Sequence, residues 1–193
     1  MWTAKRITAD AAQKMQINSG LLLSDFDISN PVAPADEDIV CETTGNFKIS
    51  CKPETVDWFD NVNNAPKNTK EGKDITGWSC GLSVTALSIT EETLGFALGA
   101  FKSTDDGGIT PKSRYTVDDF KKLYWVGDMM DGNSALVVVM DDTVSTGGLD
   151  FTSSDGGKGE LALELMPHAS IENPDVVPMA FYIVTKQSEP SEP

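Results

Sequence analysis

The segment that decides the fold is residues 147–171, GGLDFTSSDGGKGELALELMPHASI, which has the pattern of a β-hairpin. Leu149 and Phe151 alternate with polar residues, and Asp155-Gly156-Gly157 then supplies the positive φ angles that a tight turn needs. Leucines and small or acidic residues alternate on the return: Glu160, Leu161, Ala162, Leu163, Glu164 and Leu165. Successive side chains of a strand point to opposite faces, so one face is predicted to be apolar and the other acidic or small.

Two other segments, 46–56 and 76–88, show the same division. In the first, Phe47, Ile49 and Cys51 oppose Lys48, Ser50 and Lys52; in the second, Trp78, Cys80, Leu82 and Val84 oppose Ser79, Gly81, Ser83 and Thr85. We therefore predict four strands in one sheet, each with a core face and a hydrophilic face that carries no large apolar residue. The core is expected to contain Trp78, Leu82, Phe151, Leu161 and Leu163. The outer face of an ordinary β-sandwich has this pattern too, and from the pattern alone that is the simpler interpretation.

The rest of the chain indicates one mainly β domain at 17–185, between an N-terminal arm at 1–16 and a C-terminal tail at 186–193. Further strands are predicted at 17–26, 122–128, 135–141 and 176–184, the third of them buried on both faces. Thr90 is predicted to cap a helix that packs on the sheet, although Gly95 and Gly99 weaken it, and 116–119 should form one helical turn. Segments 27–42 and 59–75 are predicted loops.

Composition restricts the function. The net charge is −15, from 30 acidic and 15 basic residues, whereas a protein that binds free nucleic acid is expected to be basic. The N-terminus has no apolar core of a secretory signal, and the longest apolar run, 135–140, is too short to span a bilayer. The three cysteines, Cys41, Cys51 and Cys80, match no disulfide framework or zinc site. Cys51 and Cys80 are expected to be small buried side chains on the apolar faces of their strands, in a reducing compartment.

No catalytic motif is apparent. His168 is the single histidine and has no nucleophile partner in the sequence. The paired glycines lack the spacing of a phosphate-binding loop, and acidic clusters such as Asp141-Asp142 lack that of an EF-hand. We expect no enzymatic activity, no cofactor and no metal.

The long segment 59–75, FDNVNNAPKNTKEGKDI, concentrates basic residues in an acidic chain. Unstructured loops longer than about 12–15 residues are uncommon in compact domains and are usually functional or disordered. One interpretation is a solvated loop in which Lys67, Lys70 and Lys73 pair with Glu71 and Asp74. The other is a loop that reaches an acidic partner.

Three motifs together resemble a known family. They are Asp57-Trp58 through Trp78 with the core D-N-x-x-N-x-P-K-N-x-K-E-x-K-x-I, DFKKLYWVGD at 119–128 followed by Asn133, and GG-L-x-F through H-x-S-I with D-V-V-P-x-x-F-Y-I at 147–183. In order and spacing they resemble the major tail tube protein of long-tailed, non-contractile bacteriophages. Met179-Ala180 and the asparagine-rich 62–64 depart from the pattern.

The resemblance implies a β-sandwich or barrel-like subunit with a flanking helix and a long inter-strand loop. Six subunits would form a ring, and stacked rings would form a virion tail tube that conducts viral DNA without binding it specifically. Tape measure, tail terminator and distal tail proteins are the implied partners, with synthesis in the host cytoplasm and no membrane association.

Within such a tube, the lumen is expected to be lined by Asp150, Glu160, Glu164, Ser79, Ser83 and Thr85. The contact between rings is expected from Lys67, Lys70, Lys73, Asn64 and Asn68. Two alternatives remain: the inner tube of a contractile tail or injection device, and an acidic β-sandwich that binds glycans or cell surfaces through exposed aromatic residues such as Trp125.

Overall fold

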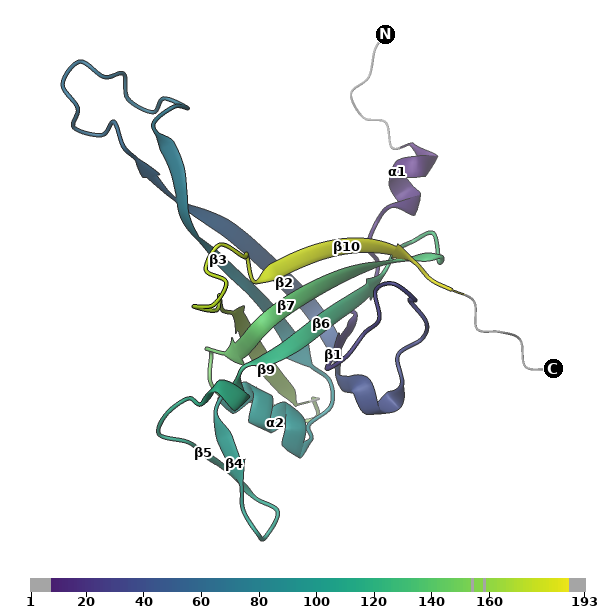
Figure 1. Cartoon of the computed structure of the whole chain (residues 1–193). Coiled ribbons are helices and arrows are strands. Elements are labelled where there is room, and N and C mark those ends of the chain that lie inside the picture. The colour runs from purple at the N-terminus through teal and green to yellow at the C-terminus, as the bar shows by residue number, and fades with distance from the viewer. Residues whose placement is uncertain (1–7, 154, 158, 188–193) are drawn as a thin grey trace.

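The computed structural model describes residues 8–153, 155–157 and 159–187, which form a mainly β fold with two short helices (Figure 1). The strands are β1 (Leu21–Leu23), β2 (Ile39–Asp57), β3 (Lys73–Ala86), β4 (Phe101–Ser103), β5 (Ile109–Pro111), β6 (Lys121–Asp128), β7 (Ser134–Ser145), β8 (Asp150–Thr152), β9 (Glu160–Pro167) and β10 (Met179–Thr185). The helices are α1 (Ala9–Gln13) and α2 (Glu91–Leu98), with 3-10 turns at Asp36–Asp38 and Val117–Asp119.

Eight strands form one antiparallel sheet in the order β10-β7-β6-β1-β2-β3-β9-β8, and β4 pairs with β5 separately. One edge of β7 is shared between two partners: β10 pairs with 134–140, and β9 pairs with 143–145. Asp142, at φ 44°, lies between the two pairings. The β7–β9 contact closes the sheet into a barrel, so the mainly β, barrel-like fold with a flanking helix is confirmed.

The four strands with divided faces are neighbours, in the order β2-β3-β9-β8. The predicted hairpin is confirmed, since Phe151 pairs with Leu161 between β8 and β9, and buried and exposed residues alternate along the whole of β9. Leu82, Leu161 and Leu163 lie in the core as predicted.

The prediction was wrong for Trp78 and Phe151, which are 40% and 48% exposed. Both have the correct alternation but lie outside the enclosed part of the sheet. Trp78 precedes the stretch of β3 that pairs with β9, which begins at Leu82, and Phe151 is on the terminal strand β8.

The barrel interior is one of two apolar clusters. Trp125 belongs to it and is fully buried, with its ring centroid 4.4 Å from that of Phe47, and its Nε1 donates to the Ser19 carbonyl at 3.0 Å. A second cluster lies on the other face of β1, β6, β7 and β10 and includes Leu23, Val137 and Val139. Because β7 contributes to both clusters, it is buried on both faces, as predicted.

Helix α2 begins where the sequence predicts. The Thr90 hydroxyl accepts from Thr93 N at 3.1 Å, and Thr93 Oγ1 accepts from Thr90 N at 2.8 Å, which satisfies two free helix donors. Gly95 is required rather than merely tolerated, because a Cβ there would lie 2.5 Å from the Phe101 ring. Gly99 ends the helix at φ 75°.

Several boundaries differ from the prediction. β2 begins at Ile39, within the predicted loop 27–42; β3 begins at Lys73, within the predicted loop 59–75; and β7 continues to Ser145. The β4–β5 hairpin was not predicted, because its two three-residue strands are too short to show a period. The last strand begins at Met179 rather than at 176.

Candidate assembly surfaces

The most prominent feature is an arm formed by the outer parts of β2 and β3, which extends well beyond the barrel (Figure 1). Pairing between the two strands continues to Asp57 and Lys73, with one irregularity between Glu54 and Thr55. The remaining loop, 58–72, forms the tip of the arm and is shorter than the predicted 59–75.

Consecutive turns shape the tip. Asn61, Asn64 and Asn68 have φ angles of 69°, 64° and 59°, a left-handed conformation that asparagine adopts more easily than most residues. Backbone N–H groups of Val62 and Ala65 donate to carbonyls three residues earlier. The asparagines at 61, 64 and 68 therefore have a conformational role that is sufficient to explain their presence.

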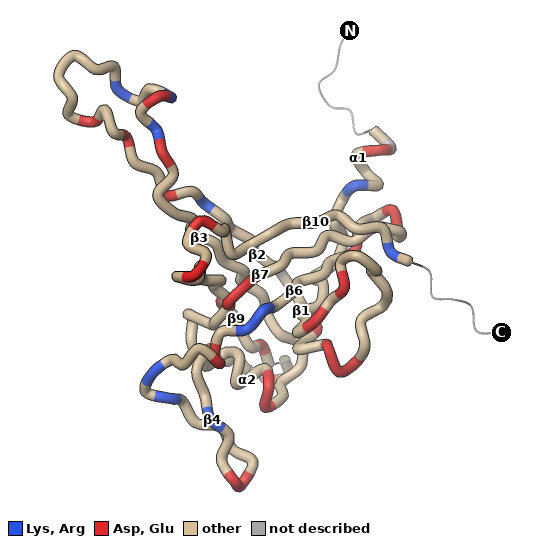
Figure 2. Tube along the Cα trace, in the orientation of Figure 1, with Lys and Arg blue, Asp and Glu red and all other residues tan. Residues whose placement is uncertain are grey.

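The three lysines of the predicted contact are exposed, two in the tip and one at the first residue of β3. Lys70 Nζ lies 3.6 Å from a carboxylate oxygen of its neighbour Glu71, which partly matches the solvated-loop interpretation. Lys73 pairs in register with Asp57. Figure 2 shows charges of both signs along the arm.

Apolar side chains are also exposed on the arm. Trp58 is 64% exposed and Ile75 is 52% exposed. Pro53 and Thr55 are two residues apart on β2, so they lie on the same face. Their partners on β3 are Trp78 and Ile75, which therefore also share one face of the arm. That face continues the core face of the barrel, and near Trp78 the segment before β10 borders it, with Val176 and Val177 lining the same pocket.

The predicted lumen residues share the hydrophilic face of β3, β9 and β8. In register, Ser83 pairs with Glu164, Thr85 with Ala162, and Asp150 with Ala162. Ser83, Glu164, Thr85 and Asp150 are predicted lumen residues, whereas Ala162 is not. The other two predicted lumen residues, Ser79 and Glu160, are exposed.

This face is less uniformly acidic than predicted. Lys48 and Lys52 of β2 pair with Ser83 and Ser79, so basic side chains adjoin the acidic ones of β9. Met166 also lies on this face, 38% exposed, which contradicts the prediction that no large apolar residue occurs there. The face thus combines short hydroxyls with separated rows of lysine and glutamate.

Strands β8 and β10 end the sheet, and each has one edge without a strand partner in the described part of the chain. Large apolar side chains are exposed on both: Phe151 on β8, and Phe181, Tyr182 and Ile183 on β10. An exposed apolar edge strand readily pairs with another strand.

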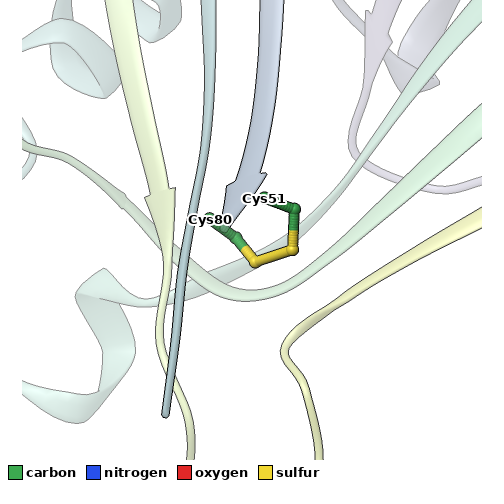
Figure 3. The surroundings of a disulfide bond; sticks show 2 residues. All are labelled: Cys51 and Cys80. Carbon is green, nitrogen blue, oxygen red and sulfur yellow. A yellow bond between two sulfur atoms is a disulfide. The ribbon is translucent and has the colours of Figure 1, made fainter. Parts of the chain in front are cut away.

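A disulfide joins Cys51 and Cys80 across β2 and β3, with the Cα atoms 4.0 Å apart (Figure 3). This corrects the prediction that Cys51 and Cys80 are small side chains without a disulfide. The register of the two strands places these residues opposite each other, and their positions along the chain could not show that. Cys41 is buried and unpaired, and burial together with Glu42 and Glu92 raises its pKa to about 12.

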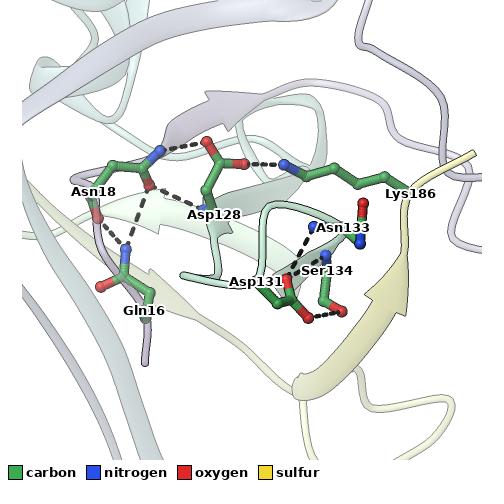
Figure 4. A network of polar contacts seen from close by, with 7 residues as sticks. All are labelled: Gln16, Asn18, Asp128, Asp131, Asn133, Ser134 and Lys186. Atoms are coloured by element: carbon green, nitrogen blue, oxygen red, sulfur yellow. Dashed lines mark hydrogen bonds and ion pairs between the residues drawn. The ribbon is translucent and has the colours of Figure 1, made fainter. Parts of the chain in front are cut away.

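A polar network holds both ends of the described chain against the β6–β7 turn (Figure 4). Asp128 accepts from Asn18 Nδ2 at 2.6 Å through one oxygen and from Lys186 Nζ at 2.6 Å through the other. In the turn, hydrogen bonds from the Ser134 hydroxyl and backbone keep the pKa of the Asp131 carboxyl below its ordinary value. The N-terminal segment is therefore anchored at Asn18, where it joins the body. Residues 1–7 and 188–193 lie outside the described part of the chain.

Within the described part of the chain, no nucleophile or carboxylate is hydrogen-bonded to His168. Its ring meets the edge of Phe120 at 5.3 Å between centroids, and its Nδ1 is buried without a hydrogen-bond partner. Among the described residues, no group of three or more His, Cys, Asp or Glu side chains could hold a metal ion. None of the helices in the described ranges is long and apolar enough to cross a membrane.

Comparison with known proteins gives a likeness of shape only. No family model matches the chain, and no curated protein matches it. A chain in the virion of a native gene transfer agent particle is 14% identical, with 85% of this chain and 95% of that chain covered and a TM-score of 0.39. A chain in the tail of an empty gene transfer agent particle with C6 symmetry is also 14% identical, with coverage of 85% and 96% and a TM-score of 0.41.

Proposed function

We propose that this protein is a structural, non-enzymatic subunit of a bacteriophage tail tube, assembled as stacked hexameric rings in the virion tail. The observation that carries the proposal is a combination of two features. In the described part of the chain, β8 and β10 each have a sheet edge without a strand partner, and β2, β3, β9 and β8 share an exposed hydrophilic face. If copies join through β8 and β10, the edges are removed and the hydrophilic faces form one continuous lining. The sequence motifs at 57–78, 119–133 and 147–183 support the same class.

Such a lining suits the passage of DNA. Hydroxyl and carboxylate groups offer phosphate little attraction, and the face lacks aromatic platforms on which bases could stack. Around the ring, the −15 charge of each chain would repel the duplex from the wall. Lys48 and Lys52 moderate this repulsion near β2, so the lining is expected to be only weakly anionic.

The arm supports stacking of rings. It extends from the barrel, carries exposed apolar and basic side chains, and does not contribute to the core of its own subunit. We propose that its tip, with Lys67, Lys70 and Lys73, contacts the next ring. Charge pairs there are individually worth about 0.2–1 kcal/mol, but every subunit of a ring repeats them.

Two other functions explain less. The inner tube of a contractile tail would use the same subunit geometry and differ only in a sheath partner on its outside. A glycan-binding sandwich was expected to expose Trp125, and that prediction is wrong because Trp125 is fully buried.

Electron microscopy of the purified full-length protein tests the proposal. We expect long bare tubes for the wild type and none for Ile183→Lys, which places a charge on the free edge strand β10. Ile171→Lys is the matched control, because Ile171 is also highly exposed but lies in a loop. A wild type that stays monomeric at all concentrations tested, or Ile183→Lys tubes of normal yield, would contradict the proposal.

A further inference from the structure

A groove of about 630 Å³ lies on the outer side of the barrel, between the β1–β2 loop and strands β1, β6 and β10. Its lining is mostly apolar and includes Leu21, Phe26, Val32, Val126, Ala135 and Val184. Most of these side chains belong to the second apolar cluster, so the groove is an incompletely covered part of that core.

The β1–β2 loop lines one side of the groove with apolar residues such as Phe26 and Val32, and it carries acidic residues beside the groove, outside its lining. Residues 17–47 contain six acidic residues and no lysine or arginine: Asp25, Asp27, Asp36, Glu37, Asp38 and Glu42. Red stretches of the chain trace mark acidic positions on the loop beside β1 in Figure 2. Asp128, also at the groove, is already paired with Lys186. A ligand suited to this groove is therefore apolar with adjacent positive charge.

Residues 1–7, MWTAKRI, have this chemistry. Trp2 and Ile7 are large apolar residues, and Lys5-Arg6 is an adjacent basic pair in a chain of net charge −15. The other terminal segment, SEPSEP at 188–193, is acidic and contains no large apolar residue, so it does not suit the groove.

Helix α1, which follows this segment, lies apart from the body of its own subunit. The helix stands away from the barrel in Figure 1, and its residues with described side chains are exposed or only partly buried. The described contacts of this region with the body are backbone bonds near its base, such as Met130 N to the Met15 carbonyl at 2.7 Å. A helix of five residues has little stability of its own in water.

We propose that residues 1–7 of one subunit bind in the apolar groove of a second copy, with Trp2 in the groove and Lys5-Arg6 against the acidic β1–β2 loop. This inference rests on the proposed self-assembly and identifies an interface separate from the sheet edges and the arm. It gives the N-terminal segment a binding site that its own sequence, too short for a core, does not provide.

Cross-linking between two full-length variants tests the inference. One copy carries Thr3→Cys, which retains Trp2, and the other carries Val32→Cys in the groove, with a mass tag to identify mixed pairs. A short bismaleimide should link the two copies, since the native cysteines are either bonded or buried. Trp2→Ala in the Thr3→Cys copy should lower the mixed-pair yield about tenfold, as loss of a buried aromatic anchor does. Lys5→Glu/Arg6→Glu should lower it several-fold and make it insensitive to salt.

Asp105→Cys is the control acceptor, because it is exposed on the β4–β5 connection and does not line the groove. A mixed-pair yield no higher than with this control would overturn the inference. So would closure of a Thr3→Cys/Val32→Cys chain on itself in dilute monomer without mixed pairs. Wild-type tubes without the cross-link would leave the proposed function intact, whereas the cross-link without tubes would support this interface and reject the tube.

Discussion

Cys51 and Cys80 face each other where the arm leaves the barrel, joined by a disulfide that bridges 29 positions of sequence. Cys80 is buried, and beyond it the core face of the two strands passes from the enclosed barrel to the open arm. The bond therefore fixes the register of β2 against β3 at the base of an otherwise unsupported hairpin.

The first prediction concerns this bond. Cys51→Ser/Cys80→Ser should lower the free energy of unfolding by about 2–4 kcal/mol, because the unfolded chain is no longer constrained by the closed loop. Urea titration of the monomer measures the change. As a control, reductant should destabilise the wild type by a similar amount and leave the double variant unaffected; equal midpoints for wild type and variant would contradict the prediction.

The second prediction concerns Cys41, whose thiol is buried and has a pKa of about 12. Because the thiolate is the reactive species, iodoacetamide should not label the native chain at pH 8. Mass spectrometry should find one labelled cysteine after unfolding in urea and three after unfolding with reductant. Labelling of the native chain would show that Cys41 is accessible.

The third prediction tests the assignment of faces in β9. Leu163→Ala should cost about 2–5 kcal/mol of unfolding free energy, because Leu163 is fully buried and the truncation leaves a cavity. Met166→Ala, three residues away on the opposite and partly exposed face, should cost much less. Urea unfolding of both variants decides, and equal costs would mean that the hydrophilic face is packed.

The fourth prediction concerns pH. Burial opposes ionisation of Asp119, but donors from Lys112 Nζ at 2.6 Å and from Thr116 outweigh it, so the pKa of Asp119 lies below its ordinary value. A lowered pKa contributes stability above the unfolded value, about 3.9, and that stability is lost as pH falls through the folded value. Asp119→Asn should therefore be less stable than wild type by about 1–3 kcal/mol at neutral pH.

Thermal unfolding from pH 7 to pH 2 provides the measurement for Asp119. The difference between wild type and Asp119→Asn should be constant down to about pH 4 and shrink below it. Asp118→Asn is the matched control, because it makes the same substitution at the exposed neighbouring residue. If the stability difference between wild type and Asp119→Asn does not change with pH, the negative charge of Asp119 is not the cause of that difference.

The fifth prediction concerns ring stacking. Lys67→Glu/Lys70→Glu/Lys73→Glu should fold normally but give shorter or fewer tubes, with the wild type itself weakened by salt over a screening length of about 8 Å at physiological ionic strength. The control Lys102→Glu/Arg114→Glu/Lys121→Glu makes the same change in net charge at exposed positions away from the arm. Tubes of unchanged length and yield in the arm variant across a salt series would show that the tip does not bind the next ring.

The sequence predicts local features of this fold well and their limits poorly. Alternation is a local property, so the four divided strands and the cap at Thr90 could be identified directly. Where a strand leaves the barrel depends on its neighbours in space. The prediction that Trp78 and Phe151 are buried was wrong for this reason. The Cys51–Cys80 bond depends on the register across a fifteen-residue tip, 58–72, which no local pattern specifies.

The candidate surfaces follow the same rule. The shared face of Ser83 and Glu164 could be predicted, because each residue alternates with core leucines or valines. The groove beneath the β1–β2 loop could not, since its lining comes from five separate segments of the chain. A signal was present nevertheless: a stretch of thirty-one residues, 17–47, contains no basic residue.

The antiparallel arm has a mechanical consequence. A pull on its tip, directed along its length, stretches β2 and β3 in the same direction, so the bonds between the two strands carry almost none of the load. The force passes instead to the β1–β2 ladder at Leu21–Leu23 and to the β3–β9 ladder between Leu82 and Ala86. Those hydrogen bonds run across the line of force and are strained together rather than one after another. The arm can thus transmit a pulling force to two separate parts of the barrel wall, and the Cys51–Cys80 bond distributes the load between them.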